Sequence, residues 1–231
     1  MYDHLLFDAD GTLLDFMSAE KSAVKRVLKE LELPVKESII ASYSKINNDV
    51  WLEMEMGLLS IKELKVERFR RFYALYNLDK DPVVGSEIYS QFLSETYHLY
   101  YDAIEVLQRL KKSGIAMSLI TNGIASVQWG RLKASAIREY FNTVVISEEI
   151  GIQKPDPRYF EITKEMVQQN GDKIENPLII GDSLTSDIAG GIASGIDTCW
   201  INRFDMTLPE NIKPTYQIKN LFELLKLLNL N

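Results

Sequence analysis

Cysteine and histidine are scarce in this chain of 231 residues, and their scarcity limits the chemistry open to it. Cys199 is the only cysteine, so an intramolecular disulfide and a thiolate metal cluster are both excluded. Its place in the apolar run 198–201 predicts a buried strand thiol. Of the 2 histidines, His4 lies in a predicted strand and His98 near a predicted helix end, and neither is assigned a role.

Long apolar runs and blocks of basic residues are also missing. No stretch approaches the length that crosses a membrane, and no basic segment precedes an apolar one near the N-terminus, so we expect a cytoplasmic protein without a membrane partner. The net charge is -7 and the cations are not clustered, which argues against a nucleic acid polymer as partner. A small phosphorylated metabolite stays compatible, because a metal ion can supply positive charge locally. The sequence is compatible with both a monomer and a homodimer.

What the chain does contain is enough apolar sequence, 46% of its residues, for a sizeable core. Five short apolar runs predict buried parallel strands, and segments of helical period separate the last four. The strands are expected at 4–8, 116–121, 143–147, 178–181 and 198–202. Asp156 followed by Pro157 predicts the start of one of the helices. This alternation predicts an α/β fold with a mainly parallel sheet.

The segment between the first two predicted strands contains only amphipathic helical patterns. Ser60 with Glu63 forms a capping-box pattern at the start of one helix. A connection of this length is better explained as an inserted helical domain than as a loop. We therefore expect a core domain of residues 1–15 and 99–231, and an inserted helical cap at 16–98 that could close over the carboxyl edge of the sheet.

Four polar motifs carry the candidate chemistry, and three of them directly follow predicted strands. They are Asp8-Ala9-Asp10-Gly11-Thr12, Thr121-Asn122-Gly123, Lys154-Pro155 and Gly181-Asp182-Ser183 with Asp187. The carboxyl ends of parallel strands share one edge of the sheet, where ligands bind, so these side chains are expected to converge. A carboxylate nucleophile, a hydroxyl, an amine and a second acidic pair are what phosphoryl transfer through an aspartyl phosphate requires.

The first motif predicts covalent catalysis by Asp8. A carboxylate that attacks phosphorus forms an acyl phosphate and divides one difficult displacement into two easier ones. Asp10 would protonate the leaving oxygen and later accept a proton from water. Taken alone, the motif is equally compatible with a strand-to-turn signal at Gly11.

The second acidic motif predicts a magnesium site, because Mg2+ prefers hard oxygen ligands. Asp182 is expected to bind the metal together with Asp8, whereas Asp187 is also compatible with helix capping. These three carboxylates bring three negative charges, and Lys154 with a magnesium ion brings three positive ones. Asp10 is then easiest to accommodate in its neutral form, which is the form that a general acid needs.

The remaining polar groups suit a phosphoryl oxygen. Thr121 offers a hydroxyl at a strand end, and Asn122 and Gly123 offer backbone N–H groups in the turn that follows. A threonine at a strand end is common without function, and a solvated side chain is the ordinary expectation for Lys154. These residues predict a phosphoryl-binding site only in combination.

These motifs, in this order, resemble those of the haloacid dehalogenase superfamily of phosphatases. The matching residues are Asp8-Ala9-Asp10-Gly11-Thr12, Thr121, Lys154, Gly181-Asp182 and Asp187. The resemblance covers nearly the whole chain and implies a Rossmann-like three-layer core, an inserted helical cap of the C1 type and an obligate Mg2+. It also implies that Asp182 binds the metal and that Asp187 supports it.

The roles of the family transfer to this chain residue by residue. Asp8 would be the nucleophile and a metal ligand. Asp10 would be the acid/base and would lend its backbone carbonyl to the metal. Thr121 and Lys154 would hold the phosphoryl group.

Within the superfamily the chain looks most like the pyrimidine 5′-nucleotidase-like branch, which acts on nucleoside monophosphates. The segments that suggest this are 14–16, 46–51, 55–57, 68–69, 120–123, 145–151 and 190–200. One departure is Tyr101-Asp102 at the cap hinge, where many relatives carry Pro-Gly. In the cap, Trp51, Phe69 and Tyr73 could stack on a base, and Asn47 could form a hydrogen bond with its edge. Alternatively, aromatic residues at helical spacing form the core of the cap.

The sequence thus predicts a magnesium-dependent phosphomonoesterase that acts on nucleoside 5′-monophosphates, with a preference for pyrimidines. A phosphatase for another small phosphate, such as phosphoglycolate or a sugar phosphate, and a phosphomutase share the same core and stay open. Dehalogenation is disfavoured, because Asp10 supplies an acid/base that carbon–halogen displacement does not need. A phosphoacceptor signalling domain is disfavoured, because the candidate nucleophile follows the first strand rather than a later one.

Overall fold

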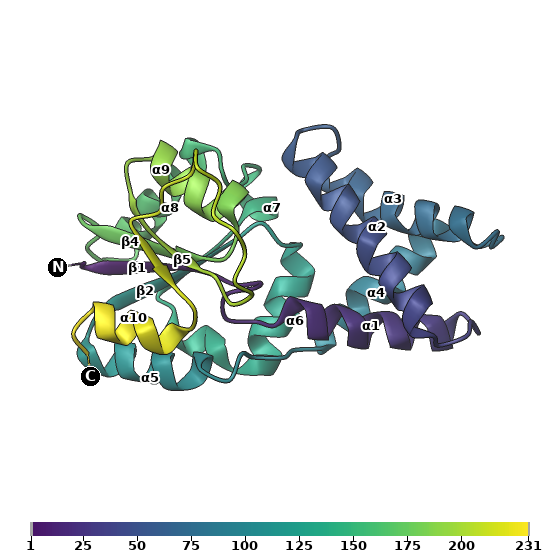
Figure 1. Ribbon diagram of the computed structural model, residues 1–231, viewed down its shortest axis with the longest axis horizontal. Coiled ribbons are helices and arrows are strands. Elements are labelled where there is room, and N and C mark those ends of the chain that lie inside the picture. Colours follow the sequence, from purple (N-terminus) through teal and green to yellow (C-terminus); the bar gives the residue numbers. More distant parts are fainter. Residues whose placement is uncertain (1, 231) are drawn as a thin grey trace. The chain divides into compact units, whose positions relative to one another are not determined.

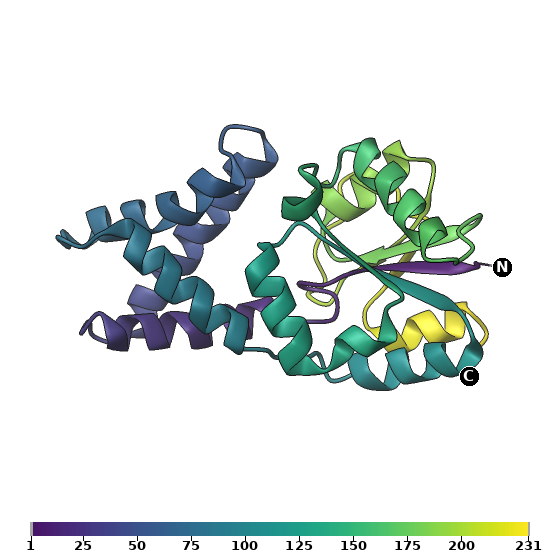
Figure 2. The ribbon, with the colours of Figure 1, turned by 180° about the vertical axis from the view of Figure 1, so that it is seen from behind.

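A computed structural model describes residues 2–230, which divide into two compact units (Figures 1 and 2). The core unit comprises the chain up to Phe16, His98–Ala125 and the chain from Ser135 on. The helical unit comprises Met17–Tyr97 and Ser126–Ala134.

The second segment of the helical unit lies within a region that the sequence assigns to the core. Gly130 of α6 (Ala125–Ser135) explains its placement, because a Cβ at this position would come within 2.7 Å of the Ser94 backbone oxygen in α4 (Pro82–Glu95). The absence of a side chain lets the two helices approach closely, and this close packing joins the middle of α6 to the helical unit.

The core unit is built on one sheet of six parallel strands in the order β3-β2-β1-β4-β5-β6. The strands are β1 (His4–Asp8), β2 (Ala116–Thr121), β3 (Thr143–Ile146), β4 (Pro177–Gly181), β5 (Asp197–Ile201) and β6 (Tyr216–Ile218). Five of them confirm the predicted strands. The sixth was not predicted, because it has three residues at the sheet edge and buries only Ile218, which leaves no apolar pattern to recognise.

Helices cover both faces of this sheet and make three layers. In Figure 1, α8 (Pro157–Gln169) and α9 (Ala189–Ala193) lie above the sheet, and α5 (Ala103–Ser113) and α10 (Leu221–Leu227) lie below it. The predicted helix start is confirmed, since the Asp156 side chain accepts the Arg158 N–H at 2.9 Å. Short helical turns complete the unit: η1 (Ile137–Tyr140), α7 (Ser147–Ile150) and the π-helical turn η2 (Leu184–Ile188). The predicted Rossmann-like α/β core is thus confirmed.

The helical unit has its own aromatic core. Its other helices are α1 (Phe16–Glu30), α2 (Glu37–Glu55) and α3 (Ile61–Leu75). The capping box of Ser60 and Glu63 is present at the start of α3. Tilted and edge-on contacts join the buried rings of Tyr43, Phe69, Phe72, Tyr73 and Tyr89. The alternative interpretation of the aromatic spacing as core is therefore correct for Phe69 and Tyr73.

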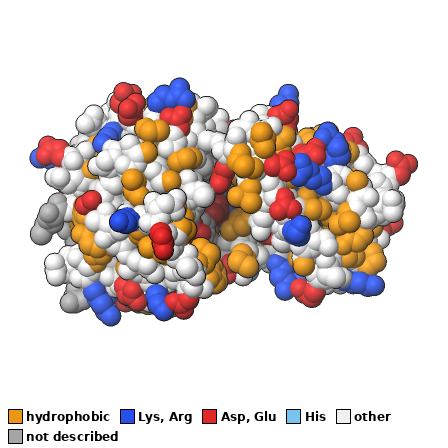
Figure 3. Space-filling view, turned by 45° about the horizontal axis from the view of Figure 1, so that its top comes forward, with side chains coloured by type: hydrophobic (Ala, Val, Ile, Leu, Met, Phe, Trp, Pro, Cys, Tyr) orange, Lys and Arg blue, Asp and Glu red, His pale blue; other side chains and the backbone are white. Residues whose placement is uncertain are grey.

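The surface carries charges of both signs. On the face shown in Figure 3, acidic and basic side chains are interspersed with apolar ones. Over residues 2–230, no helix combines the length and the apolar character that a membrane span requires.

Candidate active site

The register of the sheet brings the polar motifs of the sequence to one edge. Asp8 is the last residue of β1, and it pairs with Ile120, the residue before Thr121. On its other side β1 pairs with β4, whose last residue is Gly181. The nucleophile candidate therefore ends a central strand, with a motif at the end of the strand on either side.

Lys154 is the centre of the hydrogen-bond network at this edge. Its Nζ donates to Asp187 Oδ1 at 2.7 Å, to Asp8 Oδ1 at 2.8 Å and to the Ile120 carbonyl oxygen at 3.1 Å. The side chain is 1% exposed, so a solvated lysine is the wrong interpretation here. All three N–H donors of the ammonium are used, and the two bonds to carboxylates are of the strong, charge-assisted kind.

Three carboxylates crowd around this single cation. Oxygens of Asp8, Asp182 and Asp187 lie within 4.8 Å of one another. Burial raises the pKa of Asp8 well above its usual value, Lys154 opposes this shift, and the charges of Asp187 and Asp182 add to it. Burial and the charge of Asp187 also raise the pKa of Asp182 to about 7. The cluster therefore holds more negative charge than Lys154 can neutralise.

The unsatisfied oxygen of Asp8 indicates what would complete the cluster. Asp8 Oδ2 is buried and has no hydrogen-bond partner among residues 2–230, although a buried acceptor without a donor is costly. It belongs to the acidic cluster with Asp182 and Asp187. A divalent cation with hard oxygen ligands fits this set, because it would satisfy the oxygen and neutralise the excess charge together.

Two glycines allow the carboxylates to approach the backbone so closely. A Cβ at Gly181 would lie 2.2 Å from Asp187 Oδ2, and a Cβ at Gly11 would lie 2.1 Å from Asp182 Oδ2. Gly11 also has a φ of +85°, a conformation that other residues rarely adopt. The glycine of the first motif therefore makes room for the acidic residue of the last.

Asp187 uses both carboxylate oxygens inside the protein. Its Oδ1 accepts from Lys154, and its Oδ2 accepts from the Ser183 N–H at 3.1 Å. The side chain lies in η2 and is fully buried. This arrangement lets Asp187 hold both the ammonium of Lys154 and the turn that carries Asp182.

The turn after β2 is bonded to Lys154 through its asparagine. The Asn122 amide donates to the Lys154 carbonyl oxygen at 2.8 Å and accepts from the Lys154 N–H at 2.9 Å. The Gly123 N–H, expected to be open to a phosphoryl oxygen, donates instead to Thr121 Oγ1 at 3.1 Å. In this structure the Asn122 side chain thus positions Lys154, and the Gly123 N–H is occupied.

Two aromatic residues that the sequence did not single out also support this edge. The Tyr159 hydroxyl accepts from the Thr121 N–H at 3.0 Å and donates to the Val145 carbonyl oxygen at 2.8 Å. The Trp200 indole donates to the Asp182 carbonyl oxygen at 2.8 Å. Trp200 lies in the apolar strand β5 and Tyr159 on the buried face of the amphipathic helix α8, so their sequence pattern indicates core residues and gives no sign of these bonds.

Asp10 lies in a short loop that folds back on itself. The Gly11 N–H donates to the Leu14 carbonyl oxygen at 2.8 Å, and the Leu13 and Leu14 N–H groups donate to the Ala9 carbonyl oxygen at 3.0 and 2.8 Å. These bonds hold the loop 9–14, and the Asp10 side chain is half-buried. The general acid candidate is therefore carried by a closed loop rather than by a flexible one.

The two substrate-binding candidates of the helical unit differ in their accessibility. Asn47 is fully buried, donates to Glu20 at 2.8 Å and accepts from Arg68 at 3.3 Å. Because partners within its own unit hold both amide atoms, we do not retain it as a base contact. Trp51 is half-buried against the cluster of Val50, Met54 and Leu64, and its contact with a base stays a prediction.

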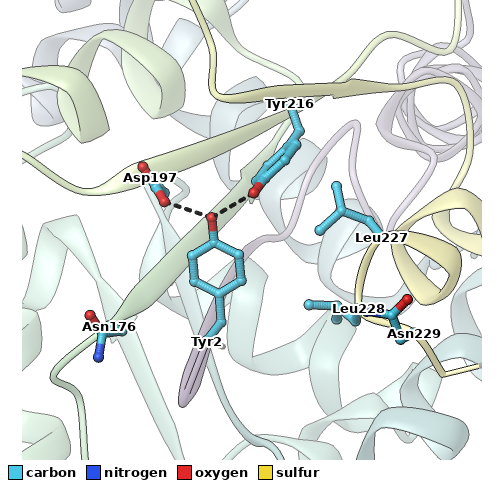
Figure 4. A pocket seen from close by; sticks show the side chains of 7 residues that line it. All are labelled: Tyr2, Asn176, Asp197, Tyr216, Leu227, Leu228 and Asn229. Atoms are coloured by element: carbon cyan, nitrogen blue, oxygen red, sulfur yellow. Dashed lines mark hydrogen bonds between the residues drawn. The ribbon is translucent and has the colours of Figure 1, made fainter.

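A separate cavity lies at the opposite edge of the sheet, and none of the motif residues lines it (Figure 4). Its walls are Tyr2, Asn176, Asp197, Tyr216, Leu227, Leu228 and Asn229. The Tyr2 hydroxyl points to the Asp197 carboxylate and donates to it at 2.6 Å.

Comparisons with known proteins agree with the geometry of the motif edge. The model of the family described as haloacid dehalogenase-like hydrolase matches residues 5–201. Pyrimidine 5′-nucleotidase PynA of Streptococcus pneumoniae is 35% identical over 230 residues, which covers 100% of this chain and 96% of that protein. Pyrimidine 5′-nucleotidase YjjG of Escherichia coli is 30% identical over 227 residues, with 98% of both chains covered.

A solved structure extends this similarity to the whole fold. The crystal structure of the HAD-hydrolase YfnB from Bacillus subtilis, bound to magnesium, aligns with a TM-score of 0.91 at 35% identity. The alignment covers 99% of each chain.

Proposed function

Because the chain belongs to the haloacid dehalogenase-like hydrolase family, we propose that it is a magnesium-dependent phosphomonoesterase with pyrimidine nucleoside 5′-monophosphates as preferred substrates. The observation that carries the proposal is the buried Asp8 carboxylate, which Lys154 holds through one oxygen while the other has no donor. The two nucleotidase relatives, which match over the full length, support the substrate class.

The acidic cluster supports a magnesium site in this proposal. Asp8 and Asp182 would hold the ion through carboxylate oxygens and Asp10 through its backbone carbonyl, while Asp187 would support them. When bound, Mg2+ would neutralise the cluster and stabilise the charge that develops on the phosphoryl oxygens. The magnesium-bound relative supports this assignment.

In the first step, an Asp8 carboxylate oxygen attacks phosphorus and the bond from phosphorus to the ester oxygen breaks. The carboxylic acid of Asp10 gives its proton to the leaving alkoxide, so that the nucleoside departs as a neutral alcohol. Lys154 orients the nucleophile, because it fixes one oxygen of the carboxylate at 2.8 Å. The product of this step is an aspartyl phosphate on Asp8.

In the second step, water attacks the phosphorus of the aspartyl phosphate and the Asp10 carboxylate accepts its proton. The bond between phosphorus and the Asp8 oxygen breaks, which releases inorganic phosphate and restores both carboxyl groups. In both steps the Thr121 hydroxyl would donate to a phosphoryl oxygen, and the positive charge of Lys154 would stabilise the negative charge of the phosphoryl group. One acid/base therefore serves both half-reactions.

A substrate panel tests the proposal. Phosphate release in the presence of Mg2+ would be measured with UMP, dUMP, dTMP, purine monophosphates, phosphoglycolate and glucose phosphates. We expect the highest kcat/KM with the pyrimidine monophosphates, and no release by the Asp8→Asn variant. Asp8-dependent release from sugar phosphates or phosphoglycolate alone would keep the mechanism and refute the substrate class. No Asp8-dependent release from any compound would refute the hydrolase.

The raised pKa of Asp182 predicts a pH-dependent stability of the metal-free protein. A carboxyl group whose folded pKa is about 7 instead of 3.8 stabilises the fold when protonated, and this contribution is lost as the pH rises from about 4 to about 7. In EDTA at pH 8, Asp182→Asn should therefore be more stable to urea than the wild type by about 2 kcal/mol, allowing for relaxation of the site.

The same experiment contains its own controls. At pH 4 the difference between Asp182→Asn and the wild type should disappear, and at pH 8 Mg2+ should stabilise the wild type more than the variant. Asp79→Asn, at an exposed position of the helical unit, should show no such pH dependence. A wild type as stable as Asp182→Asn at pH 8 in EDTA would contradict the prediction.

A further inference from the structure

Asp102 and Arg203 form a buried ion pair in the core unit, outside the motifs of the active site. The guanidinium donates to both carboxylate oxygens, each at 3.0 Å, in the bidentate geometry that fixes both side chains. The Arg203 side chain is 7% exposed and that of Asp102 is 0% exposed. Residues 101 places apart in sequence are therefore locked together out of solvent.

Each partner also bonds a further segment of the core unit. Arg203 donates to the Thr12 carbonyl oxygen at 2.9 Å, and its guanidinium lies 3.9 Å from the centre of the Tyr100 ring. Asp102 accepts the Leu221 N–H at 2.7 Å, at the start of α10. Through Thr12 the pair reaches the loop 9–14 that carries Asp10.

The same place holds the two connections that lead from the core unit to the segment Met17–Tyr97 of the helical unit and back. The Asp15 N–H donates to the His98 carbonyl oxygen at 2.8 Å, and the Tyr100 N–H donates to the Leu13 carbonyl oxygen at 3.0 Å. The segment that leads to Met17 and the segment that follows Tyr97 thus run side by side. Arg203 contacts the first through Thr12 and the second through Tyr100.

A buried ion pair contributes little to the free energy of folding, because desolvation of the two charges offsets much of their attraction. Its geometry, in contrast, is specific. The planar Arg203 guanidinium donates to both Asp102 carboxylate oxygens and to a backbone carbonyl oxygen while it lies over the Tyr100 ring. We propose that Asp102 and Arg203 are a positioning pair, which fixes the loop 9–14 and so places Asp10 for proton transfer. The effect on turnover rests on the proposed function.

Arg203→Lys is the informative variant. Lysine keeps the charge beside Asp102, but an ammonium cannot reproduce the planar fork or its stacking on Tyr100. We expect kcat for UMP to fall about tenfold to a hundredfold through misplacement of Asp10, with KM unchanged. Arg109→Gln is the matched control, since it also removes a guanidinium that donates to a backbone carbonyl in the core unit, and its kcat should not change.

Amide hydrogen exchange tests the pair without relying on activity. Exchange at Gly11 and Tyr100, whose N–H groups bond within the loop 9–14 and to it, should become at least about tenfold faster in folded Arg203→Lys. If that variant does not fold, Asp102→Asn removes the charge and keeps the acceptor for the Leu221 N–H, with the same expectations. If the exchange rates of Gly11 and Tyr100 are unchanged in a folded variant, the pair does not position the loop 9–14, and the proposal is overturned.

The two proposals fail in distinguishable ways. Absence of phosphate release by the wild type refutes the proposed function, and the exchange measurement then decides on the pair by itself. Wild-type release together with an unchanged kcat in folded Arg203→Lys overturns the positioning role and leaves the function intact.

Discussion

Replacement of Asp8 by Asn is expected to lower phosphate release by about 10⁴-fold or more and to leave the fold intact. A neutral amide is a poor nucleophile toward phosphorus, so the aspartyl phosphate does not form. The amide has the same shape as the carboxylate, and Lys154 keeps its bonds to Asp187 and to the Ile120 carbonyl. The measurement is phosphate release with excess enzyme over UMP, supported by circular dichroism of the variant.

The matched control for this variant is Asp79→Asn, which makes the same chemical change at an exposed position of the helical unit. Its activity should equal that of the wild type. An Asp8→Asn variant that retained activity within about tenfold of the wild type would exclude Asp8 as nucleophile, because loss of a covalent nucleophile lowers kcat by far more than tenfold.

Replacement of Lys154 by Met is expected to abolish phosphate release and also to destabilise the protein. Methionine has a similar length but leaves the buried carboxylates of Asp8 and Asp187 without their cation. Loss of one partner from a buried ion pair costs about 3–5 kcal/mol of unfolding free energy. Urea unfolding at pH 8 in EDTA would measure this loss.

The loss should shrink as the pH falls. Burial alone would lower the pKa of Lys154, but Asp187 and Asp8 outweigh burial and raise it, so the wild-type lysine stays charged at every pH of the experiment. The pKa of Asp8 is already raised by burial, and removal of Lys154 raises it further. A protonated carboxyl group needs no cation, so the deficit of Lys154→Met is largest at pH 8 and smaller at pH 5.

Lys173→Met provides the comparison for a lysine in solvent. Its ammonium lies 3.5 Å from Glu175 and its side chain is 79% exposed, so its replacement should change stability little at either pH. Equal effects of Lys154→Met and Lys173→Met would contradict the role of Lys154 as the central cation.

The parts of the fold that could be predicted have strong local signals. The strands that carry Asp8, Thr121 and Gly181 are apolar runs that end in polar turns, and such runs indicate buried parallel strands without knowledge of their neighbours. The Asp156-Pro157 start and the Ser60–Glu63 capping box are likewise complete within a few residues. Convergence of the motifs followed from the rule that parallel strands share one carboxyl edge.

The features that were missed have no local signal. The strand β6 is recognisable only by its pairing with β5, and the middle of α6 joins the helical unit through the packing of Gly130 on Ser94. The sequence presents Asn47 as a polar residue that is accessible to a base. In the structure its side-chain amide forms hydrogen bonds with Glu20 and Arg68. Each outcome depends on contacts between residues far apart in the chain.

The departure at the hinge illustrates the same difference. Tyr101-Asp102 stands where many relatives carry Pro-Gly, and no basic residue directly adjacent in the sequence offers Asp102 an ion-pair partner. In the fold it bonds Arg203, because the loop after β5 and the start of α5 come together beside the loop 9–14. The charge therefore has a partner that only the tertiary structure supplies.

By itself, the sequence determined the α/β class, the strands of the motif edge and the set of groups available for phosphoryl transfer, because hydrophobic period and turn chemistry act over a few residues. Only the tertiary structure decided that Lys154 is buried between Asp8 and Asp187, that one Asp8 oxygen lacks a donor, and that Arg203 holds the loop of Asp10. Burial, pKa and ion pairing depend on distances between segments remote in sequence, and sheet register and packing set those distances.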